Sequence, residues 1–230
     1  MTNLIFENVP IKENYDPMVN MAEYPFVIAP MYFDWNLSDS KELWVRKAIA
    51  DKLFDIQKKY LEPMGRKFKI WDPWRSRIVQ NNIYQKFWDE LAAENPDWDH
   101  EKLTHEVGVF VTKADQPDRI PPHATGGCVD LTVADENGDE IDFGTVFDHF
   151  GPEAAVNFFE GEGRDSTVRD NRRWLQKIMI DAGFTAHDDE WWHFDYGNQK
   201  WSLLLGHDHA FYGEVVDPIE FNNKIKSKKT

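Results

Sequence analysis

The chain contains a single cysteine, few basic residues and no long apolar run in its 230 residues. Cys128 has no second cysteine to pair with, which excludes an internal disulfide and permits a reducing compartment. Only 26 Lys and Arg residues stand against 41 Asp and Glu residues, and the net charge is −15. Nucleic acid and anionic membrane surfaces are therefore not expected partners, because phosphate binding depends on basic side chains.

Membrane-spanning and secreted classes are disfavoured as well. No apolar run approaches the roughly 18 residues that cross a bilayer, and residues 1–30 contain no uninterrupted apolar stretch after a basic start. We therefore expect no signal peptide and a cytoplasmic location. Aromatic residues, in contrast, are plentiful: they make up 14% of the chain and include ten Trp, which excludes a disordered protein.

Hydrophobic periodicity and turn signals predict a mixture of helices and strands. Helices are expected at 38–61, 76–93 and 166–182, with a weaker one at 99–107. Strands are expected at 68–71, 129–133 and 190–196, and 200–205 fits a further strand. Asn137-Gly138 predicts a hairpin turn that returns residues 140–143 beside the strand at 129–133.

These elements indicate one α+β domain over residues 1–230, with a small antiparallel sheet and helices packed on it. Their order shows no regular strand–helix–strand alternation, no internal repeat and no Gly/Ser-rich linker. Residues 1–37 are rich in Pro, Asn and aromatic residues without a clear period, and we expect them to wrap irregularly over the core. The basic segment 224–230 is expected to fray.

Two segments of the second half carry side chains that can bind a metal. His123 and Asp130 are separated by a Gly126-Gly127 pair, and a turn followed by a strand would let both side chains meet. Sixty residues later, Glu190 and His193 supply another carboxylate and another imidazole. Two imidazoles and one carboxylate are a usual ligand set for catalytic zinc, which leaves a position for water. Glu190 would then be free to take a proton from that water.

Each pattern also has an ordinary structural explanation. A His and an Asp at this spacing occur together by chance, and a single His is more often a packed or surface residue than a ligand. A Trp-Trp pair belongs more often to a core than to a site. The segment Gly206-His207-Asp208-His209 would place two His on one strand face, but a polar turn is the simpler interpretation. Spacing alone therefore gives only the hypothesis of a metal site.

The residues around these groups add a family resemblance that covers about residues 10–200. The chain resembles the D-alanyl-D-alanine dipeptidase family of zinc peptidases, which includes the vancomycin-resistance dipeptidases. The motifs that carry the resemblance are, in family order, Trp71-Asp72-Pro73-Trp74-Arg75, His123-x-x-Gly126-x-Cys128-x-Asp130, Gly144-Thr145-x-Phe147-Asp148, Asn171-Arg172-Arg173 and Glu190-Trp191-Trp192-His193. A weaker match is Tyr15-x4-Asn20.

The resemblance implies a hedgehog/DD-peptidase-like fold with one zinc ion per chain. His123, Asp130 and His193 are the implied zinc ligands, and Glu190 is the implied general base that activates the bound water. Arg75 is the implied guanidinium that stabilises the oxyanion of the scissile carbonyl, a role that suits a permanent cation with a fixed fork. The implied reaction is hydrolysis of a dipeptide, most of all D-alanyl-D-alanine, without a covalent intermediate.

The same resemblance implies two substrate-binding residues, so that the expected partner is a small dipeptide. Asp148 would hold the free ammonium of the substrate, and Tyr15 would add a hydroxyl near the oxyanion. Both Asp148 and Arg75 also have ordinary interpretations. An Asp often caps a helix or turn, and an Arg in a loop often pairs at the surface with a neighbour such as Asp72.

Two positions depart from the family pattern. Pro121 stands where the resistance-type enzymes have a Ser that helps to hold the substrate carboxylate, and proline has neither a hydroxyl nor a backbone N–H. Recognition of that carboxylate is therefore open in this chain. Cys128 stands where the family has a small residue such as Ala, and we interpret it as a small buried side chain.

The position of Glu190 relative to His193 sets a geometric condition. On a regular strand these two side chains would point to opposite faces, because the side-chain period is two. Either Glu190 lies in the loop before the strand or a bulge intervenes, and the Asp188-Asp189 pair favours a strand that starts at about Trp191.

Two other functions stay open at this level. A related carboxypeptidase or endopeptidase that acts on peptidoglycan stem peptides would use the same zinc chemistry in a more open cleft. A zinc-bearing binding module without catalysis, as in the hedgehog-like relatives of this fold, would hold the metal structurally. The presence of Glu190 and Arg75 beside a full ligand set disfavours the binding module.

Overall fold

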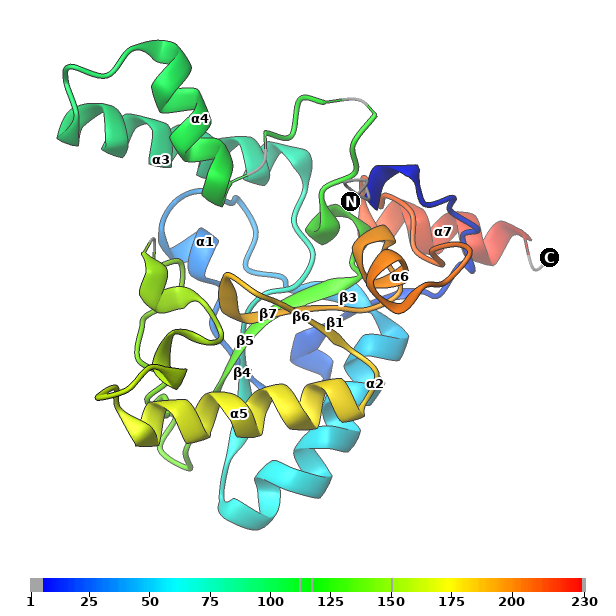
Figure 1. The fold of residues 1–230 in the computed structure, drawn as a ribbon. Helices are drawn as coiled ribbons and strands as arrows, with labels where there is room; N and C mark the ends of the chain where they lie inside the picture. The colour runs from blue at the N-terminus through cyan, green and yellow to red at the C-terminus, as the bar shows by residue number, and fades with distance from the viewer. Residues whose placement is uncertain (1–5, 112, 117, 150, 229–230) are drawn as a thin grey trace.

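A five-stranded sheet forms the centre of the protein in the computed structural model, which describes residues 6–111, 113–116, 118–149 and 151–228 (Figure 1). The strand order is β2-β4-β5-β7-β6, and every pairing is antiparallel except the parallel one between β2 and β4. The strands are β2 Val27–Ile28, β4 Lys67–Asp72, β5 Cys128–Ala134, β6 Thr185–His187 and β7 Glu190–Asp195. The predicted α+β class with a small, mainly antiparallel sheet is therefore confirmed.

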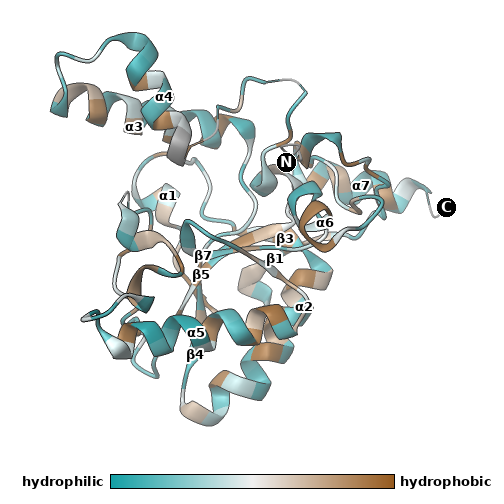
Figure 2. Cartoon of the chain, in the orientation of Figure 1, coloured by the Kyte–Doolittle hydropathy of each residue, from teal (hydrophilic) through white to brown (hydrophobic). Residues whose placement is uncertain are grey.

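Alternation along β5 separates the core from the site. Val129, Leu131 and Val133 are fully buried in the hydrophobic core, which is also where Leu175 of α5 (Ser166–Asp181) lies. The residues between them, such as Asp130, point to the opposite face because successive side chains in a strand alternate. Helices α2 (Lys47–Ile56) and α5 run along the lower side of the sheet in Figure 1, and the side of α5 toward the viewer is mostly hydrophilic in Figure 2.

The remaining elements surround this sheet. Helices α3 and α4 form an arm that projects from the body, whereas α6 and α7 lie beside the N-terminal segment (Figure 1). Their bounds, with those of the two-stranded sheet and the short first helix, are α1 Met31–Asp34, α3 Arg77–Glu94, α4 His100–Phe110, α6 Gln199–Leu205, α7 Pro218–Lys228, β1 Met18–Asn20 and β3 Trp44–Arg46. Within the described ranges, no helix has both the length and the apolar character needed to cross a membrane.

Most predicted elements are present near their expected positions. The helices expected at 76–93, 99–107 and 166–182 are α3, α4 and α5, and the strands expected at 68–71, 129–133 and 190–196 are β4, β5 and β7. The hydroxyl of Ser76 caps α3 by accepting a hydrogen bond from the amide of Val79. Helix α5 is capped by Asp165, which accepts from the amides of Thr167 and Val168.

Several predictions of local structure are wrong. The helix expected at 38–61 begins only at Lys47, because residues 44–46 form β3 and pair with β1. Residues 200–205 lie in helix α6, which Asn198 caps and Gly206 ends in a left-handed conformation. The return strand at 140–143 is reduced to one bridge between Ala134 and Glu140.

The two ends of the chain are also more ordered than expected. Residues 1–37 were expected to be irregular, but their described part includes β1, β2 and α1. The described part of the tail, up to residue 228, belongs to helix α7 instead of fraying. Asn222 of α7 exchanges two hydrogen bonds with the backbone of Met18, which ties this helix to β1.

Candidate active site

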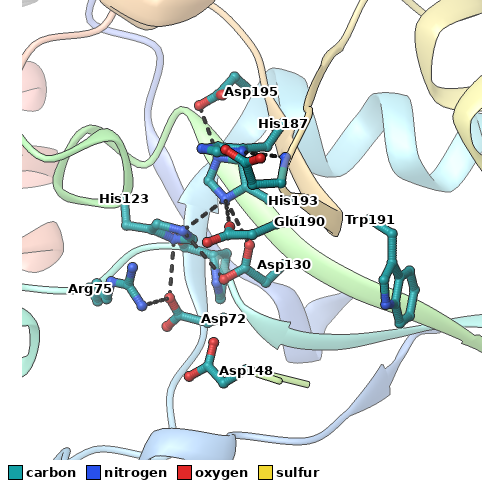
Figure 3. A network of polar contacts seen from close by, with 12 residues as sticks. Asp72, Arg75, His123, Asp130, Asp148, His187, Glu190, Trp191, His193 and Asp195 are labelled. Atoms are coloured by element: carbon teal, nitrogen blue, oxygen red, sulfur yellow. Dashed lines mark hydrogen bonds and ion pairs between the residues drawn. The ribbon is translucent and has the colours of Figure 1, made fainter. Parts of the chain in front are cut away.

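Three neighbouring strands place one acidic or imidazole side chain each in a single row. Asp72 of β4 lies opposite Asp130 of β5 because the register shifts between Ile70 and Asp72, and Asp130 pairs with His193 of β7. Residues directly opposite in a sheet point to the same face, so these three side chains converge above it (Figure 3). All three are at most 4% exposed. The row is therefore held by the strongest part of the fold, the pairing of the central strands.

His123 reaches the row from a short turn that precedes β5. Pro122–Thr125 form one 3-10 turn, and Gly126 ends it with a left-handed φ of 65°. Residues with a Cβ rarely adopt this φ, so the reversal favours glycine. The turn directs the His123 ring onto Asp130, as the Gly126-Gly127 pair predicted (Figure 3).

The facing atoms of three residues form a compact donor set. His123 Nε2 lies 3.2 Å from His193 Nδ1 and 3.3 Å from Asp130 Oδ2, and His193 Nδ1 lies 2.9 Å from Asp130 Oδ1. The outer ring nitrogens are held elsewhere: His123 Nδ1 lies 2.7 Å from the carbonyl oxygen of Pro73, and His193 Nε2 lies 3.2 Å from Asp195 Oδ1. Metal-binding histidines are oriented in this way by partners at the second nitrogen. The set fits zinc.

Two carboxylates next to His193 make this part of the site negatively charged. Burial alone would lower the pKa of His193, but Asp195 and Asp130 outweigh it and raise the pKa to about 10. Asp195 is completely buried and Asp130 nearly so. Two buried carboxylates beside one imidazole need positive charge to be stable, and a divalent metal ion supplies it.

Cys128 lies close to the donor set without matching its chemistry. One ligand atom from each of His123, Cys128 and His193 lies within 4.8 Å of the others. Burial raises the pKa of the Cys128 thiol well above its ordinary value, whereas zinc binds the thiolate. Its interpretation as a small buried residue therefore stands. Among the described residues, no candidate metal cluster includes His207 or His209.

Glu190 enters the site from the start of β7. A two-residue turn at 188–189 connects it to His187 of β6, with which it pairs. The register between β6 and β7 is interrupted next to this pair, which brings Glu190 Oε2 to 3.8 Å from His193 Nδ1. The strand thus begins at Glu190 and not at Trp191, and the irregularity satisfies the geometric condition. Burial raises the pKa of the Glu190 carboxyl.

Arg75 follows β4 directly and joins the site through two polar contacts. Its Nη1 donates to the hydroxyl of Tyr32 at 2.8 Å and lies 3.3 Å from Asp72 Oδ2. The expected surface pair with Asp72 exists, but the Arg75 side chain is only 14% exposed and lies beside the donor set (Figure 3). A cation fixed in this way is suited to stabilise developing negative charge.

Tyr32 connects Arg75 to Asp148. The Tyr32 hydroxyl donates to Asp148 Oδ2 at 2.8 Å. Asp148 has a left-handed φ of 53°, and burial is the main cause that raises its pKa to about 8. Burial disfavours the ionised carboxylate here, and a nearby cation such as an ammonium group would favour it.

Tyr15 is the one predicted site residue that lies elsewhere. Its side chain is 45% exposed, and its hydroxyl accepts a hydrogen bond from the ammonium group of Lys228 in α7. The tyrosine hydroxyl beside Arg75 belongs to Tyr32 instead. Sequence reasoning missed Tyr32 because it falls in the segment that was expected to be irregular, where no period or spacing singles it out.

Two cavities flank the donor set and share four lining residues: Arg75, Arg119, His187 and Glu190. The first, called here the Asp148 cavity, has a volume of about 580 Å³ and is also lined by Tyr32, Asp130 and Asp148. The second, called here the Lys200 cavity, has a volume of about 380 Å³ and is also lined by Pro121, His123, His193 and Lys200. The donor set thus lies between two spaces whose volumes fall in the range of small-molecule binding sites, roughly 300 to 1,000 Å³.

The chain is similar to known proteins in sequence. The family described as D-ala-D-ala dipeptidase matches residues 34–212. A D-alanyl-D-alanine dipeptidase of Synechocystis sp. is 27% identical over 169 residues, which cover 64% of this chain and 68% of the relative. One of Enterococcus faecalis is 36% identical over 149 residues, which cover 64% of this chain and 70% of the relative.

A solved structure, VanYB in complex with D-Alanine-D-Alanine, matches with a TM-score of 0.46 and 15% identity. The match covers 86% of this chain and 93% of that one. The family match spans more than half of the 230 residues. The chain therefore belongs to the D-Ala-D-Ala dipeptidase family of zinc metallopeptidases.

Proposed function

We propose that this protein is a zinc-dependent dipeptidase that hydrolyses D-alanyl-D-alanine, with Glu190 as the general base. The observation that carries the proposal is the compact His123–Asp130–His193 donor set with the Glu190 carboxylate beside it, open to two small cavities. The names of the curated relatives supply the substrate. Both Glu190 and Arg75 are present, which disfavours a binding module without catalysis.

His123, Asp130 and His193 would hold the zinc ion, which lowers the pKa of a water molecule and polarises the scissile carbonyl when bound. Glu190 takes the proton from the attacking water and passes it to the leaving amine. Its raised pKa suits the first step, because a carboxylate with a higher pKa is a stronger base toward the proton of water. Arg75 donates to the carbonyl oxygen as negative charge develops there.

Asp148 would bind the substrate's ammonium group in the Asp148 cavity. Tyr32 donates to one oxygen of the Asp148 carboxylate, which leaves the other oxygen for the substrate. Binding of a cation favours the ionised carboxylate and offsets the burial that raises its pKa. The dipeptide would then lie with its first residue in this cavity and its scissile carbonyl between the donor set and Arg75.

The first test is hydrolysis of D-Ala-D-Ala beside L-Ala-L-Ala, L-Ala-D-Ala and an N-blocked tripeptide, with and without a zinc chelator. Chelator-sensitive cleavage of D-Ala-D-Ala, lost in Glu190→Ala, is the expected result. Cleavage of the blocked tripeptide instead would indicate a stem-peptide carboxypeptidase or endopeptidase with the same zinc chemistry. No cleavage by the zinc-loaded protein would reject the enzymatic proposal. A cytoplasmic location remains a prediction, which fractionation of cells that produce the protein would test.

A further inference from the structure

The two cavities beside the donor set differ in the sign of their charged residues. The Asp148 cavity is lined by four carboxylates, from Asp130, Asp148, Asp189 and Glu190, against Arg75 and Arg119. The Lys200 cavity is lined by Arg75, Arg119 and Lys200, and Glu190 is its single acidic residue among those described. An unblocked dipeptide is a zwitterion with an ammonium at one end and a carboxylate at the other. The two spaces therefore complement its two ends.

The Lys200 cavity has no hydroxyl where the family offers one. Pro121 and Pro122 line it directly before His123, and neither has a backbone N–H. A carboxylate that enters this space must find its donors in other residues. The charged candidates not already assigned to the scissile carbonyl are Arg119 and Lys200.

Arg119 lines both cavities, and contacts of its backbone and side chain hold it in place. Its backbone carbonyl accepts a hydrogen bond from Arg77 Nη2 at 2.9 Å, and Arg77 is itself paired with Glu214. The Arg119 Nε lies 2.8 Å from a carboxylate oxygen of Glu7, and its guanidinium lies over the ring of Phe6. These contacts occupy one edge and one face of the Arg119 guanidinium.

Lys200 is oriented by a weaker contact. Its Nζ lies 3.9 Å from Asp195 Oδ2, which exceeds hydrogen-bond distance. Asp195 Oδ1 already accepts a hydrogen bond from Asn198 and also lies 3.2 Å from His193 Nε2. Lys200 can therefore donate to an incoming carboxylate without giving up a hydrogen bond to Asp195.

We propose that Lys200 and Arg119 bind the C-terminal carboxylate of the substrate and so take over the function that Pro121 cannot perform. The inference rests on the proposed dipeptidase function and orients the substrate, with its ammonium at Asp148 and its carboxylate at Lys200. A substrate without a free C-terminal carboxylate loses this interaction, which restricts the enzyme to peptides that end within the Lys200 cavity.

The test compares D-Ala-D-Ala with D-Ala-D-alaninamide, which lacks the negative charge. In the zinc-loaded wild type, kcat/KM for the acid is expected to exceed that for the amide by about 100-fold, the size of one or two charge-assisted hydrogen bonds. Lys200→Met and Arg119→Gln are each expected to raise KM for the acid about tenfold, to change kcat less than threefold or so, and to leave the amide unaffected. Lys200→Arg should retain most of the preference.

Controls separate this inference from loss of fold and loss of function. Lys177→Met removes one positive charge from the exposed face of α5 and should leave the acid-to-amide ratio unchanged. Calorimetric binding of D-Ala-D-Ala to the zinc-loaded Glu190→Gln variant should weaken when Lys200→Met is added. Cleavage of the dipeptide with an unchanged ratio in both cavity variants would overturn the inference alone. Failure of the wild type on every peptide would overturn the dipeptidase proposal and the inference with it.

Discussion

The donor set and the substrate-binding groups are built by different parts of the fold. Asp72, Asp130 and His193 stand in one row across three paired strands, each almost completely buried. Asp148 and Arg119, in contrast, lie outside helices and strands. Asp148 accepts a hydrogen bond from Tyr32, and Arg119 pairs with Glu7 of the N-terminal segment.

This contrast separates the chemistry of the reaction from the choice of substrate. Strand pairing positions Asp130 and His193, and the turn that ends at Gly126 adds His123, which together give the defined geometry that a metal site requires. Loops tolerate substitution more readily than strands, so the cavity walls can change without disturbing the donors. Pro121 is an example: it lines the Lys200 cavity from outside the strands, whereas Asp130 and His193 stand in paired strands.

The largest expected effect comes from removing one residue of the donor set. His123→Ala should abolish hydrolysis and bound zinc together, because the remaining Asp130 and His193 cannot complete the ligand set. Metal content by elemental analysis should fall from one zinc per chain, while circular dichroism stays unchanged. A variant that keeps its zinc and its activity would show that His123 is not a ligand.

Loss of the general base should come next in size. Glu190→Gln keeps the shape of the side chain but cannot accept a proton, so kcat should fall by about 10³-fold. Zinc content should remain at the wild-type level, since Glu190 is not expected to be a ligand. Activity within tenfold or so of the wild type would assign the proton transfer to another group.

Substitution of a residue that contacts the donor set from outside should reduce zinc affinity without abolishing it. Asp195→Asn removes the charge that holds His193 Nε2 at 3.2 Å, and zinc affinity should fall about 10-fold to 100-fold. Competition with a fluorescent chelator measures this change. Lys177→Met, on the surface of α5, serves as the control and should leave the affinity as it is.

The smallest effect is expected on the loop side, where Asp148→Asn should raise KM for D-Ala-D-Ala about tenfold and should stabilise the metal-free protein at neutral pH. Asn adopts a left-handed φ as readily as Asp, so the backbone at 53° is not strained.

The stabilisation should depend on pH in a defined direction. The folded pKa of Asp148, about 8, lies above that of an unfolded chain, so Asp148 costs stability as pH rises from about 4 to 8. The advantage of Asp148→Asn over the wild type should therefore grow over this range and then level off. Thermal melts at pH 5 and pH 8 that show the same difference would contradict this account.

The sequence identified the reactive residues better than it identified their surroundings. His123, Asp130, Glu190 and His193 lie within short motifs, and the structure brings them to one point. Tyr32, by contrast, meets Asp148 across 116 positions of the chain, a proximity that only the tertiary fold creates.

Local structure was predicted well where period and end signals agreed, and poorly where they competed. Ser76 and the apolar period of 76–93 both indicate a helix, and α3 follows them. At 200–205 the short apolar run fits a strand or a helix equally, and the Asn198 and Gly206 end signals decide for α6. At 38–61 the apolar pattern continues through β3, whose pairing with β1 is a tertiary contact outside any window.

The row across β4, β5 and β7 makes activity an indicator of correct folding. A slip of β5 by one residue would turn Asp130 toward the core and present Leu131 beside His193, because each residue shift inverts the faces of a strand. Such a misfolded molecule would bury the Asp130 carboxylate among apolar side chains, and the same shift would remove this carboxylate from the donor set. Zinc uptake therefore selects the native strand alignment, and a partly active misfolded form is not expected to accumulate.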